Sequence, residues 1–236
     1  MPVLALDTSA TASAAVVDDA GATLATRSTP EPRRHAELLM PLIDEVLTEA
    51  GITRGALTAV VAGTGPAPFT GLRVGLVTAR TLGLALGIPV HGVSSLDAVA
   101  LATVTASERS DLHGRDVLVV TDARRREVYW ARYRPVVVAG VAPSVEVLDG
   151  PGVETPAALA AAGLDGALLV GAGTLLYPDL LPGTPGAPTE VDPADLARVA
   201  LARLAARPAG VRLPTEPLYL RRPDAVPPAP GKRVLG

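Results

Sequence analysis

A short acidic turn near the start of the chain is the first feature that could do chemistry. Asp7, followed by Thr8 and Ser9, comes directly after the apolar run from Val3 to Leu6. A carboxylate at a strand end either orients a metal-bound water or a nucleotide phosphate, or hydrogen-bonds the backbone of its own turn. The residue types alone leave both roles open for Asp7.

Two later segments carry weaker signals. Gly171-Ala172-Gly173 follows an apolar strand, as an adenosine-binding loop would, but a Gly-x-Gly pattern describes a simple turn equally well. The other segment is a predicted hairpin rich in arginine, with Arg124, Arg125, Arg126, Arg132 and Arg134. These side chains form either a basic patch for RNA phosphates or an ordinary solvated face.

Composition excludes several classes of chemistry. The chain has no Cys, so it has no disulfide, no thiolate metal site and no Cys nucleophile. His35, His91 and His113 lie far apart in the sequence and form no local pair, and no His-Glu-x-x-His motif is present. We therefore expect no bound metal and no metalloprotease activity.

Charge and hydropathy point to a cytoplasmic protein that does not hold nucleic acid by itself. The formal net charge is -3, whereas an autonomous nucleic-acid binder usually carries a strongly basic face. No apolar run reaches the roughly 18 residues that a membrane span needs. If RNA is involved, we expect another subunit to hold it.

The first half of the chain should build one mixed sheet with helices. The expected order is strand 3–6, strand 14–17, strand 23–25, helix 35–50, strand 59–62, helix 71–86 and strand 88–93. Ser94, with Asp97 three residues later, predicts a capping box at the start of a further helix. The polar stretch from Ser107 to Asp116 is the best domain boundary.

The second half repeats the opening pattern, because the strand 117–120 also leads into an Asp-containing turn and a returning strand. The repeat suggests a duplication. We predict subdomains over 1–106 and 107–222 and a disordered tail over 223–236. A last helix over 193–205, capped by Asp192, could pack back on the first subdomain.

The helix predicted from residue 71 carries a ridge almost free of side chains. Its small residues recur every fourth position and are Gly71, Gly75, Ala79 and Gly83. Interior Gly weakens a helix, so something must approach this backbone closely. That neighbour is either the chain's own sheet or a helix of another subunit. The preceding helix offers two apolar ridges, one of them Leu38, Leu42 and Val46, which is more than one buried face requires.

Four segments, taken together and in order, carry a family resemblance. They are Asp7-Thr8-Ser9, the loop and helix start from Gly65 to Gly75, Asp122-Ala123-Arg124, and Pro217 to Arg221. The chain resembles the TsaB family, formerly YeaZ, and the most specific match runs from Phe69 to Gly75. The resemblance implies an α/β, duplicated actin-like fold (ASKHA, ribonuclease H-like), in which each of two subdomains has a mixed sheet flanked by helices.

The resemblance also implies a function without catalysis. TsaB-type chains act as scaffold or activator subunits in forming N6-threonylcarbamoyladenosine at adenosine 37 of tRNA, and they bind the catalytic subunit TsaD. In TsaD the strand matching Val90 to Val93 is followed by a metal-binding His-x-x-x-His pair, and these positions are Ser95 and Val99 here. Imidazoles at i and i+4 share one helix face, whereas Ser and Val cannot replace them. We expect no catalytic residue.

The implied partners are the TsaD-type paralogue, a TsaE-type ATPase, a second copy when the protein is alone, and tRNA only indirectly. The family pairs the helices 35–50 and 71–87 with their counterparts in a four-helix arrangement. The predicted interface is therefore Leu38, Leu42, Val46, Gly71, Gly75, Ala79 and Gly83.

No cofactor of its own is expected, and ATP or ADP would bind only in the heteromeric complex. The residues expected to face such a nucleotide are Asp7, Thr8, Ser9 and Arg73. The alternatives are a degenerate actin-like ATPase or kinase, which would need intact phosphate and adenosine loops, and a free-standing transferase, which would need the missing His pair.

Overall fold

The computed structural model describes residues 1–29, 31, 34–138, 140–164 and 166–221. Within these residues the first half of the chain forms a five-stranded sheet in the order β3-β2-β1-β4-β5. The strands are β1 (Val3–Asp7), β2 (Ser13–Val17), β3 (Thr23–Ser28), β4 (Ala59–Gly63) and β5 (Val90–Val93). The first three are antiparallel neighbours, while β4 is parallel to β1 and β5 is parallel to β4.

The second half repeats this plan with four strands in the order β8-β7-β6-β9, counted over the described residues. They are β6 (Val117–Asp122), β7 (Val128–Val136), β8 (Ser144–Glu154) and β9 (Leu168–Val170). Again an antiparallel meander is followed by a strand parallel to its first member. This repeat confirms the predicted class, a duplicated actin-like α/β fold. The tail predicted over 223–236 lies outside the described residues.

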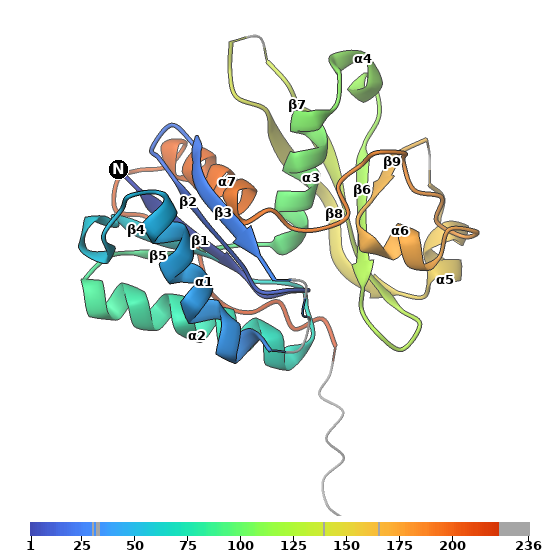
Figure 1. The fold of residues 1–236 in the computed structure, drawn as a ribbon. Coiled ribbons are helices and arrows are strands. Elements are labelled where there is room, and N and C mark those ends of the chain that lie inside the picture. Colours follow the sequence, from blue (N-terminus) through green and yellow to red (C-terminus); the bar gives the residue numbers. More distant parts are fainter. Residues whose placement is uncertain (30, 32–33, 139, 165, 222–236) are drawn as a thin grey trace, which may run out of the picture.

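Helices cover the faces of both sheets (Figure 1). α1 (His35–Glu49) and α2 (Phe69–Leu86) pack on one face of the first sheet, and α7 (Pro193–Ala205) packs on the other. α3 (Ser95–Ala106) lies between the sheets, in contact with α7 and with the second sheet. The remaining short helices are η1 (Arg54–Ala56), α4 (Arg109–Leu112), α5 (Pro156–Ala161) and α6 (Ala172–Leu176). None of the described helices is both long and apolar enough to cross a bilayer.

A buried polar network ties α3 to the second subdomain. The Asp97 carboxylate accepts a hydrogen bond from the Tyr133 hydroxyl at 2.8 Å and pairs with Arg203 of α7 at 2.7 Å. The capping box predicted for Ser94 and Asp97 is therefore only half right. The Ser94 hydroxyl does cap the helix by accepting from the backbone N–H of Leu96, but the Asp97 side chain joins three elements of the fold instead.

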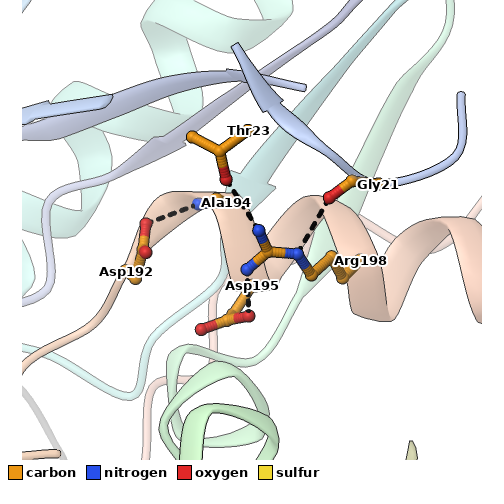
Figure 2. A network of polar contacts seen from close by, with 6 residues as sticks. All are labelled: Gly21, Thr23, Asp192, Ala194, Asp195 and Arg198. Atoms are coloured by element: carbon orange, nitrogen blue, oxygen red, sulfur yellow. Dashed lines mark hydrogen bonds and ion pairs between the residues drawn. The ribbon is translucent and has the colours of Figure 1, made fainter. Parts of the chain in front are cut away.

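Helix α7 belongs late in the sequence, yet it is pinned to the first sheet. Figure 2 shows the Arg198 guanidinium reaching from α7 to the turn between β2 and β3. It donates to the Gly21 carbonyl at 2.9 Å and to the Thr23 hydroxyl at 2.6 Å. It also pairs with the buried Asp195 at 2.6 Å. The N-cap expected at Asp192 is present, since its side chain accepts from the backbone N–H of Ala194. The helix therefore packs on the first subdomain, which the sequence allowed but did not decide.

Replacing Arg198 by Ala is expected to lower the free energy of unfolding by about 1–3 kcal/mol, because it removes three contacts and leaves the Asp195 carboxylate unpaired in a buried place. The matched control is Arg27→Ala, whose ion pair with Glu49 is about half exposed and should be worth under about 1 kcal/mol. Urea denaturation measures both. Equal losses in the two variants would contradict this role for Arg198.

Candidate functional site

The Asp7 carboxylate is buried at the end of β1, where neighbouring groups donate hydrogen bonds to it. One oxygen accepts from the backbone N–H of Ser9 at 2.8 Å and from its hydroxyl at 2.5 Å. The other accepts from the Ser95 hydroxyl at 2.6 Å. Gly63 leaves room for this arrangement, because a Cβ there would run into the carboxylate. Of the two roles open for Asp7, these contacts favour the structural one.

Burial raises the pKa of the Asp7 carboxyl above its ordinary value, although the hydrogen bonds from Ser9 and Ser95 oppose the shift. From about pH 4, the ordinary value of Asp, up to this raised pKa, the folded protein binds a proton that the unfolded chain does not. The contribution of Asp7 to stability therefore falls as the pH rises through this window.

An Asp7→Asn variant mimics the protonated acid and keeps the acceptor for Ser9. We expect it to be at least as stable as the unaltered protein at pH 7 and to lose part of its advantage near pH 4. Chemical denaturation across this pH range checks the prediction. A variant that is less stable at pH 7, with an unchanged pH profile, would contradict it.

A cavity of about 320 Å³ lies between the two subdomains. Its lining is largely apolar, with Leu96 and Val99 of α3 and Leu175 and Leu176 of α6. The charged lining residues are Asp122, Glu190 and Arg124. Two carboxylates against one guanidinium disfavour a polyphosphate.

The residues predicted to face a nucleotide are not gathered around this cavity. Ser9 lines it, while Asp7 is turned into the fold. The Thr8 hydroxyl donates to the Gly71 carbonyl at 2.8 Å, against the start of α2. Arg73 stacks over the Phe69 ring, 3.5 Å from its centroid. The prediction is therefore corrected for Thr8, which is buried with its hydroxyl bound to α2. For Arg73, which is exposed, it stays a prediction.

The positions that correspond to the metal-binding His pair also have other roles. The Ser95 hydroxyl is bound to Asp7, and Val99 is fully buried in the core around α3. Among the described residues no group of three or more His, Cys, Asp or Glu side chains is placed to hold a metal. The absence of a resident metal or cofactor remains a prediction.

The loop at Gly171 is a packing turn. A Cβ at Gly171 or Gly173 would meet Val120, so the two glycines let α6 lie close to β6. Ala172 alone of the three residues lines the cavity. The simple-turn interpretation of the Gly-x-Gly pattern is the one that these contacts favour.

The turn between β6 and β7 has an unusual backbone for its sequence. Arg124, Arg125 and Arg126 have φ values of 63°, 53° and 62°. The Glu127 N–H donates to the Arg124 carbonyl at 3.0 Å, so Arg125 and Arg126 occupy the central positions of a type I′-like turn. Such turns favour Asn-Gly, and a left-handed conformation costs a residue with a side chain about 1–2 kcal/mol.

The other two arginines of this hairpin lie apart from the turn. Arg132 pairs with Asp116, and Arg134 pairs with Glu146 farther along β7. The five arginines therefore do not form the single patch that was considered from the sequence, and only three of them are concentrated at the turn.

Residues 213–221, which we call the C-terminal strap, connect the two subdomains. The Leu213 carbonyl accepts from the N–H of Gly92, and the N–H of Leu218 donates to the Thr64 carbonyl at 2.9 Å. At its end Arg221 pairs with Glu127 and donates to the Ala123 carbonyl at 2.7 Å. The strap thus runs from β5 to the base of the arginine turn.

An exposed aromatic cluster forms where the strap meets α2. The rings of Phe69 and Tyr219 are 4.8 Å apart, and the Arg73 guanidinium donates to the Tyr219 hydroxyl at 3.0 Å. Phe69 is 40% exposed. The ring therefore packs on the surface of the protein and does not enter the core.

The small-residue ridge of α2 faces the chain's own sheet. A Cβ at Gly75 would lie 2.5 Å from the Thr8 hydroxyl, and one at Gly83 would collide with Val90 of β5. Ala79 is fully buried, as is Val46 on α1, and Leu42 is nearly so. A residue already covered in the single chain cannot meet a partner. The prediction that these five residues form the interface is therefore wrong, and Gly71 likewise packs against the Thr8 backbone.

The opposite side of α2 is exposed and carries both apolar and basic side chains. We call it the outer stripe of α2, and it consists of Phe69, Arg73, Val77, Arg80 and Leu84. Val77 is 61% exposed and Leu84 is 86% exposed. On the neighbouring α1, Met40 is exposed and Leu38 is half-buried. Exposed apolar side chains grouped on adjacent helices are typical of a contact surface.

Comparison with known proteins agrees with this fold. The family model described as TsaD, tRNA N6-adenosine threonylcarbamoyltransferase, matches residues 29–148, about half of the chain. An uncharacterised protein of Mycobacterium tuberculosis is 44% identical over 205 residues, which are 86% of this chain and 83% of that protein.

Two named proteins are also similar. The Escherichia coli tRNA threonylcarbamoyladenosine biosynthesis protein TsaB is 33% identical over 134 residues, or 57% of this chain and 55% of that protein. The solved structure of YeaZ from Pseudomonas aeruginosa has a TM-score of 0.72 and 31% identity, covering 93% of this chain and 99% of that chain.

The repeated sheets, the buried Asp at the end of β1 and the family-model match place the chain among actin-like proteins related to the tRNA threonylcarbamoyltransferase. More narrowly, the near-complete match to YeaZ shows that the chain belongs to the TsaB (YeaZ) family.

Proposed function

We propose that this protein is a non-catalytic subunit in the formation of N6-threonylcarbamoyladenosine at adenosine 37 of tRNA, where it binds and supports a TsaD-type catalytic subunit. The proposal rests on the residues at the two positions that correspond to the paralogue's metal-binding His pair. Ser95 is bound to the buried Asp7, and Val99 is in the core. Neither side chain is a metal ligand of the kind that paired imidazoles provide.

The partner surface that we propose is the outer stripe of α2 together with the adjoining exposed face of α1. The family pairs these two helices with their counterparts, and the buried ridge of α2 leaves the outer stripe as the side that a partner can reach. Its exposed valine and leucine supply apolar area, and Arg73, held over the Phe69 ring and near the Tyr219 ring, supplies a preordered cation. Aromatic and Arg side chains are enriched at interface hot spots.

The same surface would serve a homodimer when the protein is alone, so the two assemblies would be mutually exclusive. A TsaE-type ATPase would join the heteromeric complex, and ATP or ADP would bind only there. The tRNA would be held mainly by the catalytic subunit, and all of this would take place in the cytoplasm. The acidic net charge of -3 supports a division of labour in which this chain is not the principal RNA binder.

The test is to mix the purified chain with its TsaD-type paralogue and to measure mass and activity. We expect a stable heteromer, disappearance of any homodimer, and threonylcarbamoyl transfer that needs the catalytic subunit. Transfer by this chain alone, abolished by Asp7→Ala, would overturn the non-catalytic role. Absence of any heteromer would overturn the scaffold role.

A further inference from the structure

We propose that the turn Arg124-Arg125-Arg126 contacts the phosphate backbone of tRNA in the assembled complex. The inference rests on the proposed function, which supplies a tRNA substrate, and it adds a direct contact to the indirect one expected from the sequence. In Figure 1 the turn projects from the lower end of the second sheet, between β6 and β7. All three arginines are exposed.

The backbone conformation of this turn is unfavourable for the residues that occupy it. Arg125 and Arg126 stand at two successive left-handed positions, with φ of 53° and 62°, and Arg124 is left-handed as well. Asn-Gly fits such a turn without strain. Three successive arginines there reduce the stability of the fold, so a requirement for their side chains is the simplest explanation of their presence.

The turn is also held in place by hydrogen bonds and ion pairs at its base. The Asp122 carboxylate accepts from the backbone N–H of Arg124 at 2.7 Å and pairs with its guanidinium at 3.1 Å. Ala123 and Glu127 close the hairpin with a backbone hydrogen bond of 3.0 Å, and Arg221 of the strap binds both of these residues. A turn anchored on both sides presents its side chains at little cost in conformational entropy.

The chemistry of the arginine side chains fits a phosphate ligand. Guanidinium groups bind phosphate oxygens through paired hydrogen bonds and keep their charge at any physiological pH. Three of them in succession at a projecting turn fit a line of backbone phosphates. The surface proposed for the protein partner is on α1 and α2, which leaves this turn available for RNA. Contacts of this kind position a nucleic acid without reading its sequence.

The decisive variant is R125N/R126G, which gives the turn its preferred residues and removes two cations. In the heteromer with the TsaD-type subunit, we expect the affinity for an unmodified tRNA transcript to fall about tenfold near 0.1 M salt. The slope of log affinity against log salt should decrease by about 2, close to one for each lost phosphate contact. The Tm of the variant chain should stay the same or rise by a few degrees.

Two control variants separate a contact at the turn from a general loss of surface charge and from an effect of the substitutions on the turn itself. R54A/R134A also removes two arginines, both surface ion-paired and outside the turn, and should leave the tRNA affinity within about twofold. R125K/R126K keeps the charge and should retain most of the salt slope.

Unchanged tRNA affinity in R125N/R126G, with the heteromer intact, would overturn the inference and leave the proposed function standing. A variant that loses the heteromer would assign the turn to a protein contact, which also overturns it. If the unaltered chain forms no heteromer, the proposed function fails, and this inference fails with it.

Discussion

A V77R/L84R variant is expected to lose its complex with the TsaD-type subunit while remaining folded. Val77 and Leu84 are seven residues apart on α2, so they lie on the same side of the helix, and they are 61% and 86% exposed. In the single chain, two arginines at these positions would remain in water and cost little. In a packed helical interface they would be buried without partners, which costs several kcal/mol.

Titration of the labelled paralogue should show a loss of affinity of at least about 100-fold, or nearly 3 kcal/mol at 1.4 kcal/mol for each factor of ten. The matched control is Val141→Arg, because Val141 is 62% exposed but lies in the connection between β7 and β8. It should bind like the unaltered chain. Equal affinity of V77R/L84R and the unaltered chain would place the interface away from the outer stripe.

Gly75→Leu is expected to destabilise the protein strongly. Even a Cβ at Gly75 would come within 2.5 Å of the Thr8 hydroxyl, which is itself bound to the carbonyl of Gly71. The rest of a leucine side chain has no space between α2 and β1 without movement of the helix. Overpacking of this kind costs about 3 kcal/mol, which for a chain of this size corresponds to a fall in Tm of about 6–12 °C.

Thr81→Leu is the matched control, since Thr81 is exposed on the same helix, and it should change Tm by no more than about 2 °C. Differential scanning calorimetry of the isolated chain measures both variants. A Gly75→Leu protein with an unchanged Tm and a lost complex would restore the original interpretation, in which the small-residue ridge faces a partner.

The main elements of the fold could be predicted because each has a strong local signal. The buried strands read as apolar runs ending in Asp7 and Asp122, and α1 and α2 begin and end within two residues of the predicted bounds. The repeated strand, Asp, turn and strand order was sufficient to predict the duplication. Short helices such as α5 and α6 were not predicted, because five or six residues are too few to show a helical period.

The candidate site was harder to predict, because its contacts join residues far apart in sequence. A ridge of small residues indicates close approach but does not say what approaches, and only the positions of Thr8 and Val90 show that it is the chain's own sheet. The pairing of Phe69 with Tyr219 likewise depends on the path of the strap. At Arg125 and Arg126 the sequence lacks the Asn-Gly signal that normally predicts a type I′ turn.

The most direct test of the central claim is the amount of N6-threonylcarbamoyladenosine in bulk tRNA, measured by nucleoside mass spectrometry in cells depleted of this protein. We predict that depletion lowers the modified nucleoside, that the unaltered chain restores it, and that V77R/L84R produced at the same level does not. An unchanged amount of the nucleoside after depletion would contradict the account.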